Sequence, residues 1–281
     1  MDNLDDFFTY DELLIEPMGE FGWEIDFVSW RDKTADWNRY EAVVIRSPWD
    51  YQDDPELFMN VLEKIDATSA QLENKLETVK WNIDKTYLQD MQDKGIKIVP
   101  TLWYESWDQV TNVQYFFDEL QVNEIIIKPT LSANADDTYR IKKQDISSYK
   151  TRLKEIFERR PFMVQPFLES IITEGEFSLF YFGSAYSHAI IKKPRKGDFR
   201  VQEEHGGTLH KHIPDEELKS IARKTMQNIH PLPLYSRVDF ARLPDGSYGL
   251  MELELIEPSL YFNMDEESPK LFAKVFNEWM S

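Results

Sequence analysis

Three carboxylates near the end of the chain have a spacing that suits metal chemistry. Asp239 lies in the apolar run at residues 235–241, and Glu252 and Glu254 lie in a second apolar run at residues 249–258. A Pro-Asp-Gly turn between the runs predicts a β-hairpin. Because side chains alternate along a strand, Glu252 and Glu254 project from one face. Carboxylates among apolar residues are costly to bury without a cation, and Mg²⁺ is normally held by one or two carboxylates plus substrate phosphates.

A solvated outer face of an acidic hairpin explains the same three residues equally well. Basic residues elsewhere favour the metal interpretation. Lys128 ends an apolar strand and precedes a small polar loop, which suits phosphate binding, although lysines also reach solvent from strand ends. The stretch at residues 190–200, with Lys193 and Arg200, is the one dense basic cluster. Such a cluster near a carboxylate site suits a metal–triphosphate, with a solvated basic turn as the alternative.

Residues 162–168 form an apolar strand interrupted by Pro166. Backbone beyond the interruption leaves the sheet ladder and could bind a flat heterocycle edge-on, although an edge strand explains the pattern more simply. Arg46 follows a buried strand and is a candidate for binding a substrate carboxylate, with a structural ion pair as an equal alternative. Gly206 and Gly207 could act as the hinge of a covering loop.

Composition excludes several classes of function. The chain has 281 residues, no cysteine and a formal net charge of −19. Disulfides, thiolate metal sites and a cysteine nucleophile are therefore excluded, and binding to nucleic-acid backbones is disfavoured. No apolar run approaches the roughly 20 residues of a membrane-spanning helix, and the acidic start does not resemble a signal peptide. We expect a soluble, cytoplasmic protein with no nucleic-acid or membrane partner.

Hydrophobic periodicity predicts the elements that must position these residues. Strands are expected at residues 23–30, 41–46, 96–101, 124–128 and 162–168, and in the C-terminal hairpin. Helices are expected from Pro55 and at residues 82–94, 110–120, 148–159, 215–229 and 268–280. Strands with helical crossovers come first and a strand-rich half follows, so the sequence predicts an α/β protein of several lobes.

Nine short strings, in this order, resemble those of the ATP-grasp superfamily. The likeness is greatest to its glutathione-synthetase-like group, which includes the ligase of cycloserine biosynthesis. The strings are RSPWDY, KWNIDKTYL, IIIKP, VQPFL, GEFSL, SHAIIKKP, GDFR, YSRVDF and MELELIEP. The resemblance covers residues from about 11 to the end. It implies an N-terminal parallel-sheet domain (residues 1–78), a small ATP-grasp lobe (79–160) and a large lobe with the metal site (161–281).

The resemblance also implies roles for individual residues. Contacts to ATP phosphates would come from Lys85, Lys128 and Lys193, and the transferring group would be stabilised by Arg200. The hinge that holds adenine would consist of Gln165, Pro166, Phe167 and Leu168, with Glu176 near the ribose. Two Mg²⁺ ions, or Mn²⁺ in their place, would be held by Asp239, Glu252 and Glu254. The acidic pair of the family stands 13 positions apart, as Asp239 and Glu252 do here.

Three departures from the family pattern stand out. Glu254 occupies a position that is commonly asparagine, which adds negative charge and should tighten metal binding. The loop after Lys128 has no glycine at residues 132–136, so its backbone should wrap phosphate less freely. The first strand of the N-terminal domain is expected to be missing or encoded upstream of Met1.

These features predict an ATP- and Mg²⁺-dependent ligase. It would join a carboxylate to an amine or related nucleophile through an acyl phosphate, acting on small amino-acid-like molecules. Two alternatives stay open, namely a kinase-like enzyme and a nucleotide-binding regulatory protein that has lost turnover. A structural protein with an acidic face would not explain the ordered basic residues. The sequence does not identify the substrates, and a homodimer would fit the family.

Overall fold

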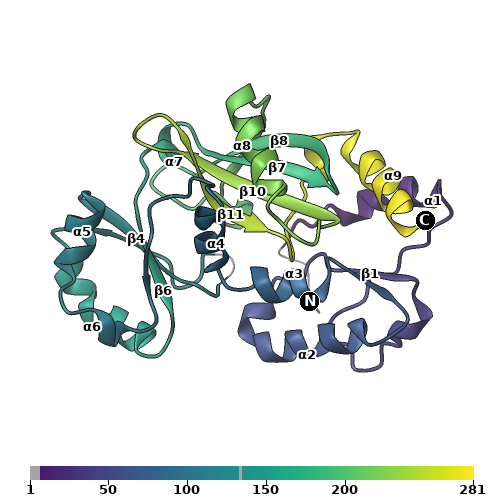
Figure 1. The fold of residues 1–281 in the computed structure, drawn as a ribbon, viewed down its shortest axis with the longest axis horizontal. Helices are drawn as coiled ribbons and strands as arrows, with labels where there is room; N and C mark the ends of the chain where they lie inside the picture. The colour runs from purple at the N-terminus through teal and green to yellow at the C-terminus, as the bar shows by residue number, and fades with distance from the viewer. Residues whose placement is uncertain (1–6, 133–134) are drawn as a thin grey trace.

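The computed structural model describes residues 7–132 and 135–281. Its strands form three separate sheets, each with its own helices (Figure 1). Predictions about residues 1–6, and about Ala133 and Asn134 in the loop after Lys128, lie outside the described residues. Within the described part, no helix is long and apolar enough to cross a membrane.

The first sheet has two parallel strands, β1 (Ala42–Val44) and β2 (Gln71–Glu73). Helix α2 (Pro55–Asp66) connects them and buries Phe58, Leu62 and Ile65. Asp54 caps the helix, because its side chain accepts a hydrogen bond from the Leu57 amide at 3.0 Å. The strand expected at residues 41–46 and the helix expected from Pro55 are therefore confirmed.

Residues 23–30 do not form the strand that their alternating pattern predicted. The tryptophans at the two ends of this segment bind distant side chains instead. The Trp23 indole donates to Asn277 at 3.2 Å, and the Trp30 indole donates to Asp50 at 2.8 Å. These two tryptophans thus anchor an irregular segment. Phe27 between them is 63% exposed, so the side chains do not alternate in burial as they would on a half-buried strand.

The second sheet has four strands in the order β3-β6-β4-β5. It carries α5 and α6 on one side, at the left of Figure 1, and has its own apolar core, which includes Phe116, Phe117, Leu153 and Phe157. The bounds of its elements are β3 (Leu102–Tyr104), α5 (Gln114–Leu120), β4 (Glu124–Pro129), β5 (Tyr139–Lys142), α6 (Ile146–Phe157) and β6 (Phe162–Pro166). Strand β6, which follows the expected boundary at residue 160, pairs within this sheet. The expected domain boundaries themselves stay predictions.

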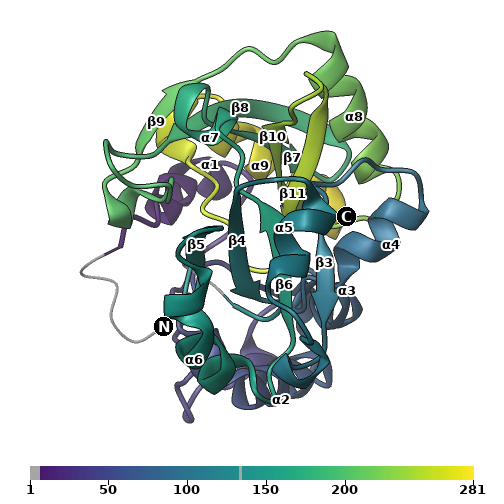
Figure 2. The same ribbon diagram turned by 90° about the vertical axis from the view of Figure 1, so that its left-hand side faces the viewer.

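The third sheet has five antiparallel strands in the order β11-β10-β7-β8-β9. Its two faces alternate along β7: Leu179 packs toward α4 and α8, while Phe180 packs toward α1 and α9 (Figure 2). The elements are α4 (Tyr87–Asp93), α7 (Ser170–Thr173), β7 (Glu176–Phe182), β8 (Ala185–Lys193), β9 (Thr208–Lys211), α8 (Glu216–Met226), β10 (Tyr235–Arg242), β11 (Tyr248–Glu254) and α9 (Ser268–Met280), with α1 (Ile15–Gly19) from the N-terminal part. The predicted C-terminal hairpin is confirmed as β10 and β11.

Two predicted elements before the second sheet differ from the structure. The helix expected at residues 82–94 begins later, as α4 (Tyr87–Asp93). A separate helix that was not expected, α3 (Leu76–Asn82), ends where it was predicted to begin, and Lys85 lies in the segment between them. The strand expected at residues 96–101 makes only a single bridge, between Ile98 and Leu250. Ile96 and Ile98 pack into the core of the five-stranded sheet, so burial of apolar side chains explains their pattern without a continuous ladder.

His188 on β8 gives a prediction for acid stability. Its ring stacks on Phe180 with centroids 4.2 Å apart, and burial lowers its pKa to about 4. The unfolded chain, with an ordinary histidine pKa near 6.5, therefore binds the proton more readily between about pH 4 and 6.5. The free energy of unfolding should fall by roughly 1–3 kcal/mol across this window as the pH is lowered. Denaturant titrations should show a shallower fall in His188→Phe and an unchanged one in the exposed His210→Gln; equal slopes in all three proteins would contradict the assignment.

Candidate active site

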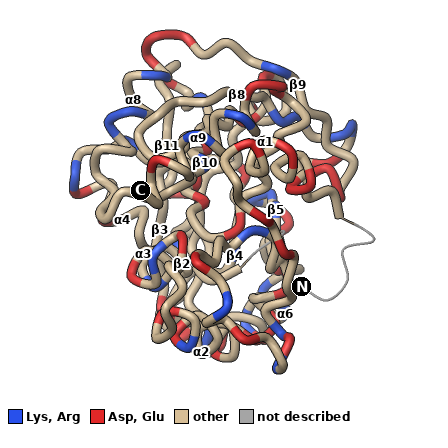
Figure 3. Tube along the Cα trace, turned by 90° about the vertical axis from the view of Figure 1, so that its right-hand side faces the viewer, with Lys and Arg blue, Asp and Glu red and all other residues tan. Residues whose placement is uncertain are grey.

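A cleft of about 220 Å³ lies between residues of all three parts of the chain. Its lining includes residues of β4 and β6 from the four-stranded sheet and of β7, β8, β10 and β11 from the five-stranded sheet. Trp49 and Tyr51, in the segment after β1, complete it. Acidic residues are spread over the whole trace (Figure 3), so the basic residues gathered at this cleft stand out against the chain's charge of −19.

Most of the site residues predicted from the sequence line this cleft, and five do not. Those that line it are Lys85, Lys128, Gln165, Pro166, Phe167, Leu168, Glu176, Arg200, Glu252 and Glu254. Asp239 lies just behind it, joined to the lining through Arg237 and Lys192. Lys193, Arg46, Gly206 and Gly207 are not among its lining residues.

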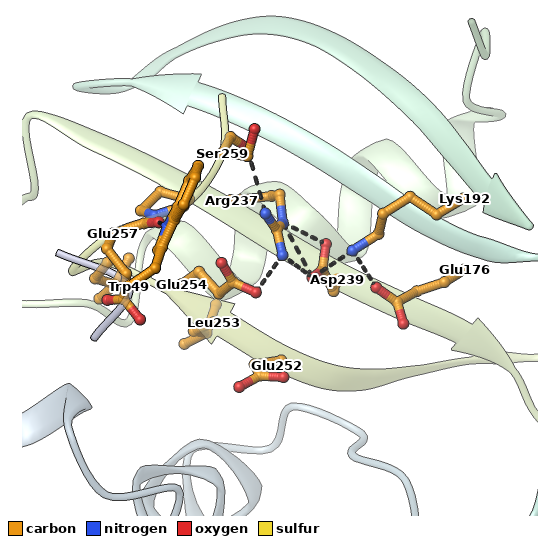
Figure 4. A network of polar contacts seen from close by, with 12 residues as sticks. Trp49, Glu176, Lys192, Arg237, Asp239, Glu252, Leu253, Glu254, Glu257 and Ser259 are labelled. Carbon is orange, nitrogen blue, oxygen red and sulfur yellow. Dashed lines mark hydrogen bonds and ion pairs between the residues drawn. The ribbon is translucent and has the colours of Figure 1, made fainter. Parts of the chain in front are cut away.

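Arg237 is the centre of a buried ionic cluster on the β10–β11 hairpin (Figure 4). Its Nε and Nη2 both lie 3.1 Å from Oδ2 of Asp239, and Nη2 also binds Glu254. Strand register explains these contacts, because Arg237 pairs with Glu254, and Asp239 pairs with Glu252. Although burial disfavours the charged carboxylate, Arg237 and Lys192 lower the pKa of Asp239 below its ordinary value.

Lys192 links this cluster to Glu176 on the neighbouring strand. Its Nζ lies 2.5 Å from Oε1 of Glu176 and 3.2 Å from Oδ2 of Asp239. Burial and the nearby Arg237 oppose the charge of Lys192, but Asp239 and Glu176 outweigh them and raise its pKa. The structure therefore brings Lys192 into the site where the sequence predicted Lys193, since Lys192 is the residue that register places opposite Glu176.

Lys85 and Lys128 lie on the other side of Glu252. The Lys85 ammonium donates to the Ser132 carbonyl at 2.6 Å and lies 3.2 Å from Oε1 of Glu252. Burial lowers the pKa of Lys128, with Glu252 opposing and Lys85 adding to the fall. Burial alone would raise the pKa of Glu252, but the two lysines outweigh it and hold the pKa below its ordinary value. Two cations held this close together at a cleft favour a ligand with several negative charges.

The carboxylates of the hairpin have the right chemistry for Mg²⁺. Burial raises the pKa of Glu254 to about 7, and Asp239 and Glu252 add to the rise while Arg237 opposes it. Burial therefore favours the neutral form of Glu254, and a bound cation would favour its charged form. Across residues 7–132 and 135–281, no three Asp, Glu, His or Cys side chains are grouped so that they could hold a metal ion as they stand. The donor set of Asp239, Glu252 and Glu254 fits a hard cation, and their own counter-cations are Arg237, Lys192 and Lys85 in this structure.

The apolar end of the cleft lies at the end of β6. Pro166 pairs with Ile125, and the Phe167 amide donates to the Glu124 carbonyl at 3.0 Å, so the ladder continues one residue further than the proline suggested. Beyond it, Leu168 packs with Val99 and other apolar residues that line the same end. This surface suits a flat heterocycle, while the amide of Phe167 is already engaged.

The remaining predicted residues lie in ion pairs or loops. Arg200 lines the cleft and forms a bidentate pair with Asp198, with Nη2 2.9 Å from Oδ2. Arg46 lies 2.9 Å from Asp11 and donates to the Pro258 carbonyl at 3.1 Å, so the structure shows the ion-pair alternative. At Gly207 a Cβ atom would come within 2.0 Å of the Val201 carbonyl oxygen. The glycine is therefore needed for the close packing of this loop.

Sequence reasoning missed Lys192, Arg237 and Glu257. Arg237 could have been found, because it stands two residues before Asp239 on a predicted strand and therefore shares its face. The choice between Lys192 and Lys193 needed the strand register. Glu257 follows β11 and lies in the MELELIEP string, but that string gave it no role, and only the fold shows that it lines the cleft.

Comparison with known proteins found a matching family model and a relative that is similar over most of the chain. Residues 1–74 match the family described as "D-cycloserine synthetase DcsG, N-terminal domain". The cycloserine biosynthesis protein DcsG of Streptomyces lavendulae is 30% identical over 286 residues, which cover 94% of this chain and 92% of the relative.

Two solved structures are similar in fold. The crystal structure of D-cycloserine synthetase DcsG superimposes with a TM-score of 0.82 and 28% identity, covering 96% of this chain and 94% of that one. The ATP-grasp ligase PsnB, complexed with a minimal precursor, Mg and ADP, has a TM-score of 0.64 and 14% identity, covering 99% and 95%. At that identity, PsnB shows similarity of fold alone.

Proposed function

The chain belongs to the family of the cycloserine biosynthesis protein DcsG and is an ATP-grasp ligase, and from this premise we propose that it joins a carboxylate to an amine with release of ADP. The substrates in this proposal are small amino-acid-like molecules. The carboxylate is activated as an acyl phosphate, and the amine or a related nucleophile then displaces phosphate. A cytoplasmic location and the use of two Mg²⁺ ions, or Mn²⁺, belong to the same proposal, and a homodimer stays open.

The observation that carries the proposal is the gathering of cations at one cleft of a strongly acidic protein. Lys85, Lys128, Lys192, Arg200 and Arg237 all line it. A triphosphate would find there the several cations that phosphoryl transfer requires. Ion pairs hold four of these cations, Lys85, Lys192, Arg200 and Arg237, in position before the substrate arrives.

We assign roles by position along the cleft. Lys85 and Lys128 would bind the phosphates, and Lys192 takes the part expected of Lys193. The adenine would lie against the apolar end near Leu168, with Glu176 towards the ribose. In the family, Mg²⁺ neutralises charge on the phosphates, and Asp239, Glu252 and Glu254 would hold it.

The proposed reaction has two steps and needs no covalent enzyme intermediate. An oxygen of the substrate carboxylate attacks the γ-phosphorus, and the bond to the bridging oxygen breaks to release ADP. The amine nitrogen then attacks the acyl carbon and phosphate leaves, with one proton lost from nitrogen. Arg200 and Arg237 would stabilise the charge on the transferring phosphoryl and acyl oxygens.

The first substrate to test follows from the relative's name. D-cycloserine contains a ring amide, and opening that amide gives the amino acid β-aminooxy-D-alanine. Closing the ring is a carboxylate–amine ligation within one molecule. We expect this amino acid to cause release of ADP from ATP, and an ADP-release assay is the first test.

Nucleotide binding can be tested before any substrate is known. Saturating ATP with Mg²⁺, at about 100 times its dissociation constant, should add about 2.7 kcal/mol to the free energy of unfolding. For a chain of 281 residues the unfolding midpoint should rise by roughly 4–6 °C. Lys128→Ala and Glu252→Gln should lose this rise, because each removes a charge that the nucleotide–metal complex contacts. Thermal unfolding with and without ligand measures it.

Matched changes away from the cleft serve as controls. Lys143→Ala, in an exposed pair with Asp118, and Glu278→Gln on α9 should keep the full rise. Absence of a rise in the wild type at millimolar ATP would refute the ligase proposal.

A further inference from the structure

The segment that follows β11 is held rigidly at the end of the cleft. The Trp49 indole donates to the Glu257 carbonyl at 2.8 Å, and Arg46 donates to the Pro258 carbonyl at 3.1 Å. Arg237 donates to the Ser259 carbonyl at 3.3 Å. Three consecutive carbonyls are thus fixed by three side chains from other parts of the fold. The side chain of Glu257, which lines the cleft, therefore projects from an immobilised backbone (Figure 4).

Unlike the other carboxylates of the site, Glu257 has no ion-pair partner among the described residues. Glu176, Asp239, Glu252 and Glu254 each form an ion pair with a lysine or arginine of the chain. Among the described residues, no ion pair involves Glu257, and its hydrogen-bond partner is the hydroxyl group of Tyr51. Burial raises the pKa of Glu257 to about 8, with Glu254 adding to the rise and Lys85 opposing it. A carboxylate without an ion-pair partner in a cleft is costly, so a cation from the ligand would favour its charged form and be bound there.

We propose that Glu257 and Tyr51 bind a cationic amino group of the substrate, and so restrict the enzyme to amine-bearing carboxylic acids. This inference rests on the proposed ligase function. The bound amino group is a recognition group and not the nucleophile, because an attacking amine must be neutral. Glu257 lies beyond the strand that carries the metal-site carboxylates, and Trp49 lies beside it (Figure 4). Aromatic side chains favour an organic ammonium over Mg²⁺, which keeps a shell of water.

The probe pair for this subsite is D-cycloserine and 3-isoxazolidinone, the same ring without the amino group. Calorimetric titration would use protein loaded with Mg²⁺ and ADP. The wild type should bind D-cycloserine at least about tenfold more tightly than 3-isoxazolidinone. A tenfold difference in affinity is what one charge-assisted hydrogen bond contributes. Glu257→Gln should reduce the preference to within about twofold, since it keeps the shape and removes the charge. Glu278→Gln, with the same change in net charge, should keep the tenfold preference.

The two proposals fail in different ways. If the wild type binds both rings equally, or neither, or if Glu257→Gln keeps the full preference, this inference is overturned. The ligase function is tested separately by Mg²⁺–ATP binding in the same proteins. Should Glu257→Gln fail to bind Mg²⁺–ATP, the decision rests on Glu257→Asp and Tyr51→Phe. Glu257→Asp should keep a preference for the amine, and Tyr51→Phe should weaken it; an unchanged preference in Tyr51→Phe would then count against the subsite.

Discussion

Arg237→Met should lower the free energy of unfolding by about 3–5 kcal/mol, because it leaves buried carboxylates without their main counter-cation. The arginine side chain is 8% exposed and Asp239 is 2% exposed. Methionine fills a similar volume and supplies no charge. ADP release should fall at least about a hundredfold, since one preorganised donor is lost from the transferring group. Denaturant titration and an ADP-release assay measure the two effects.

Arg242 provides the matched control on the same strand. It pairs with Glu174, and the two side chains are 30% and 40% exposed. Arg242→Met should therefore cost no more than about 1 kcal/mol and leave turnover in place. If the two variants were equally stable, Arg237 would not be the counter-cation that we infer. Adding Glu254→Gln to Arg237→Met should recover part of the lost stability, because it removes one of the unpaired charges.

Asn74→Leu should cost about 3–6 kcal/mol of unfolding free energy, the second large effect that the structure predicts. The Asn74 amide is fully buried and donates to the carbonyls of Tyr235 and Leu255 at 2.9 and 2.7 Å. Its oxygen accepts from the Leu234 amide at 2.6 Å. Leucine has a similar size but leaves these three backbone groups unpaired. They lie at the ends of β10 and β11, so the nucleotide-dependent rise in midpoint should be lost as well.

Asn38→Leu is the comparison for this substitution. Asn38 is exposed and its side chain makes only local or long hydrogen bonds. Its replacement should stay within about 0.5 kcal/mol of the wild type. Denaturation curves that overlap for the two variants would show that Asn74 does not join the N-terminal part to the hairpin.

The family and the fold class could be predicted from short strings of residues. The ATP-grasp fold and the ligase class are confirmed by the 30% identity to DcsG and by the TM-score of 0.82. The hairpin was predictable because its signal is local, with two apolar runs and a turn. Asp239 and Glu252 indeed pair directly across its strands. Their role as metal ligands stays a prediction.

Features that depend on distant partners could not be predicted. Lys192 and Lys193 are the same residue type in adjacent positions, and only pairing with β7 decides which one meets Glu176. Arg46 follows a strand end as expected, but it forms an ion pair with Asp11, 35 positions away in the sequence. The pattern of residues 23–30 showed neither what the backbone binds nor which side chains are buried, since Phe27 is exposed.

The chain enters and leaves the four-stranded sheet at two neighbouring crossings. The chain enters it after Val99, whose amide binds the Leu250 carbonyl, and leaves it at Phe167. Gln165 donates to Thr101 at 3.0 Å, so one hydrogen bond ties the entry to the exit. Met163 and Trp103 provide apolar contact with the neighbouring core. The loop after β4 adds a third connection, because Thr130 binds the Asp84 carboxylate and Lys85 donates to the carbonyls of Thr130 and Ser132. A rotation of the four-stranded sheet about the two crossings would leave the strands of both sheets intact, but it would have to break these contacts at the phosphate end of the cleft.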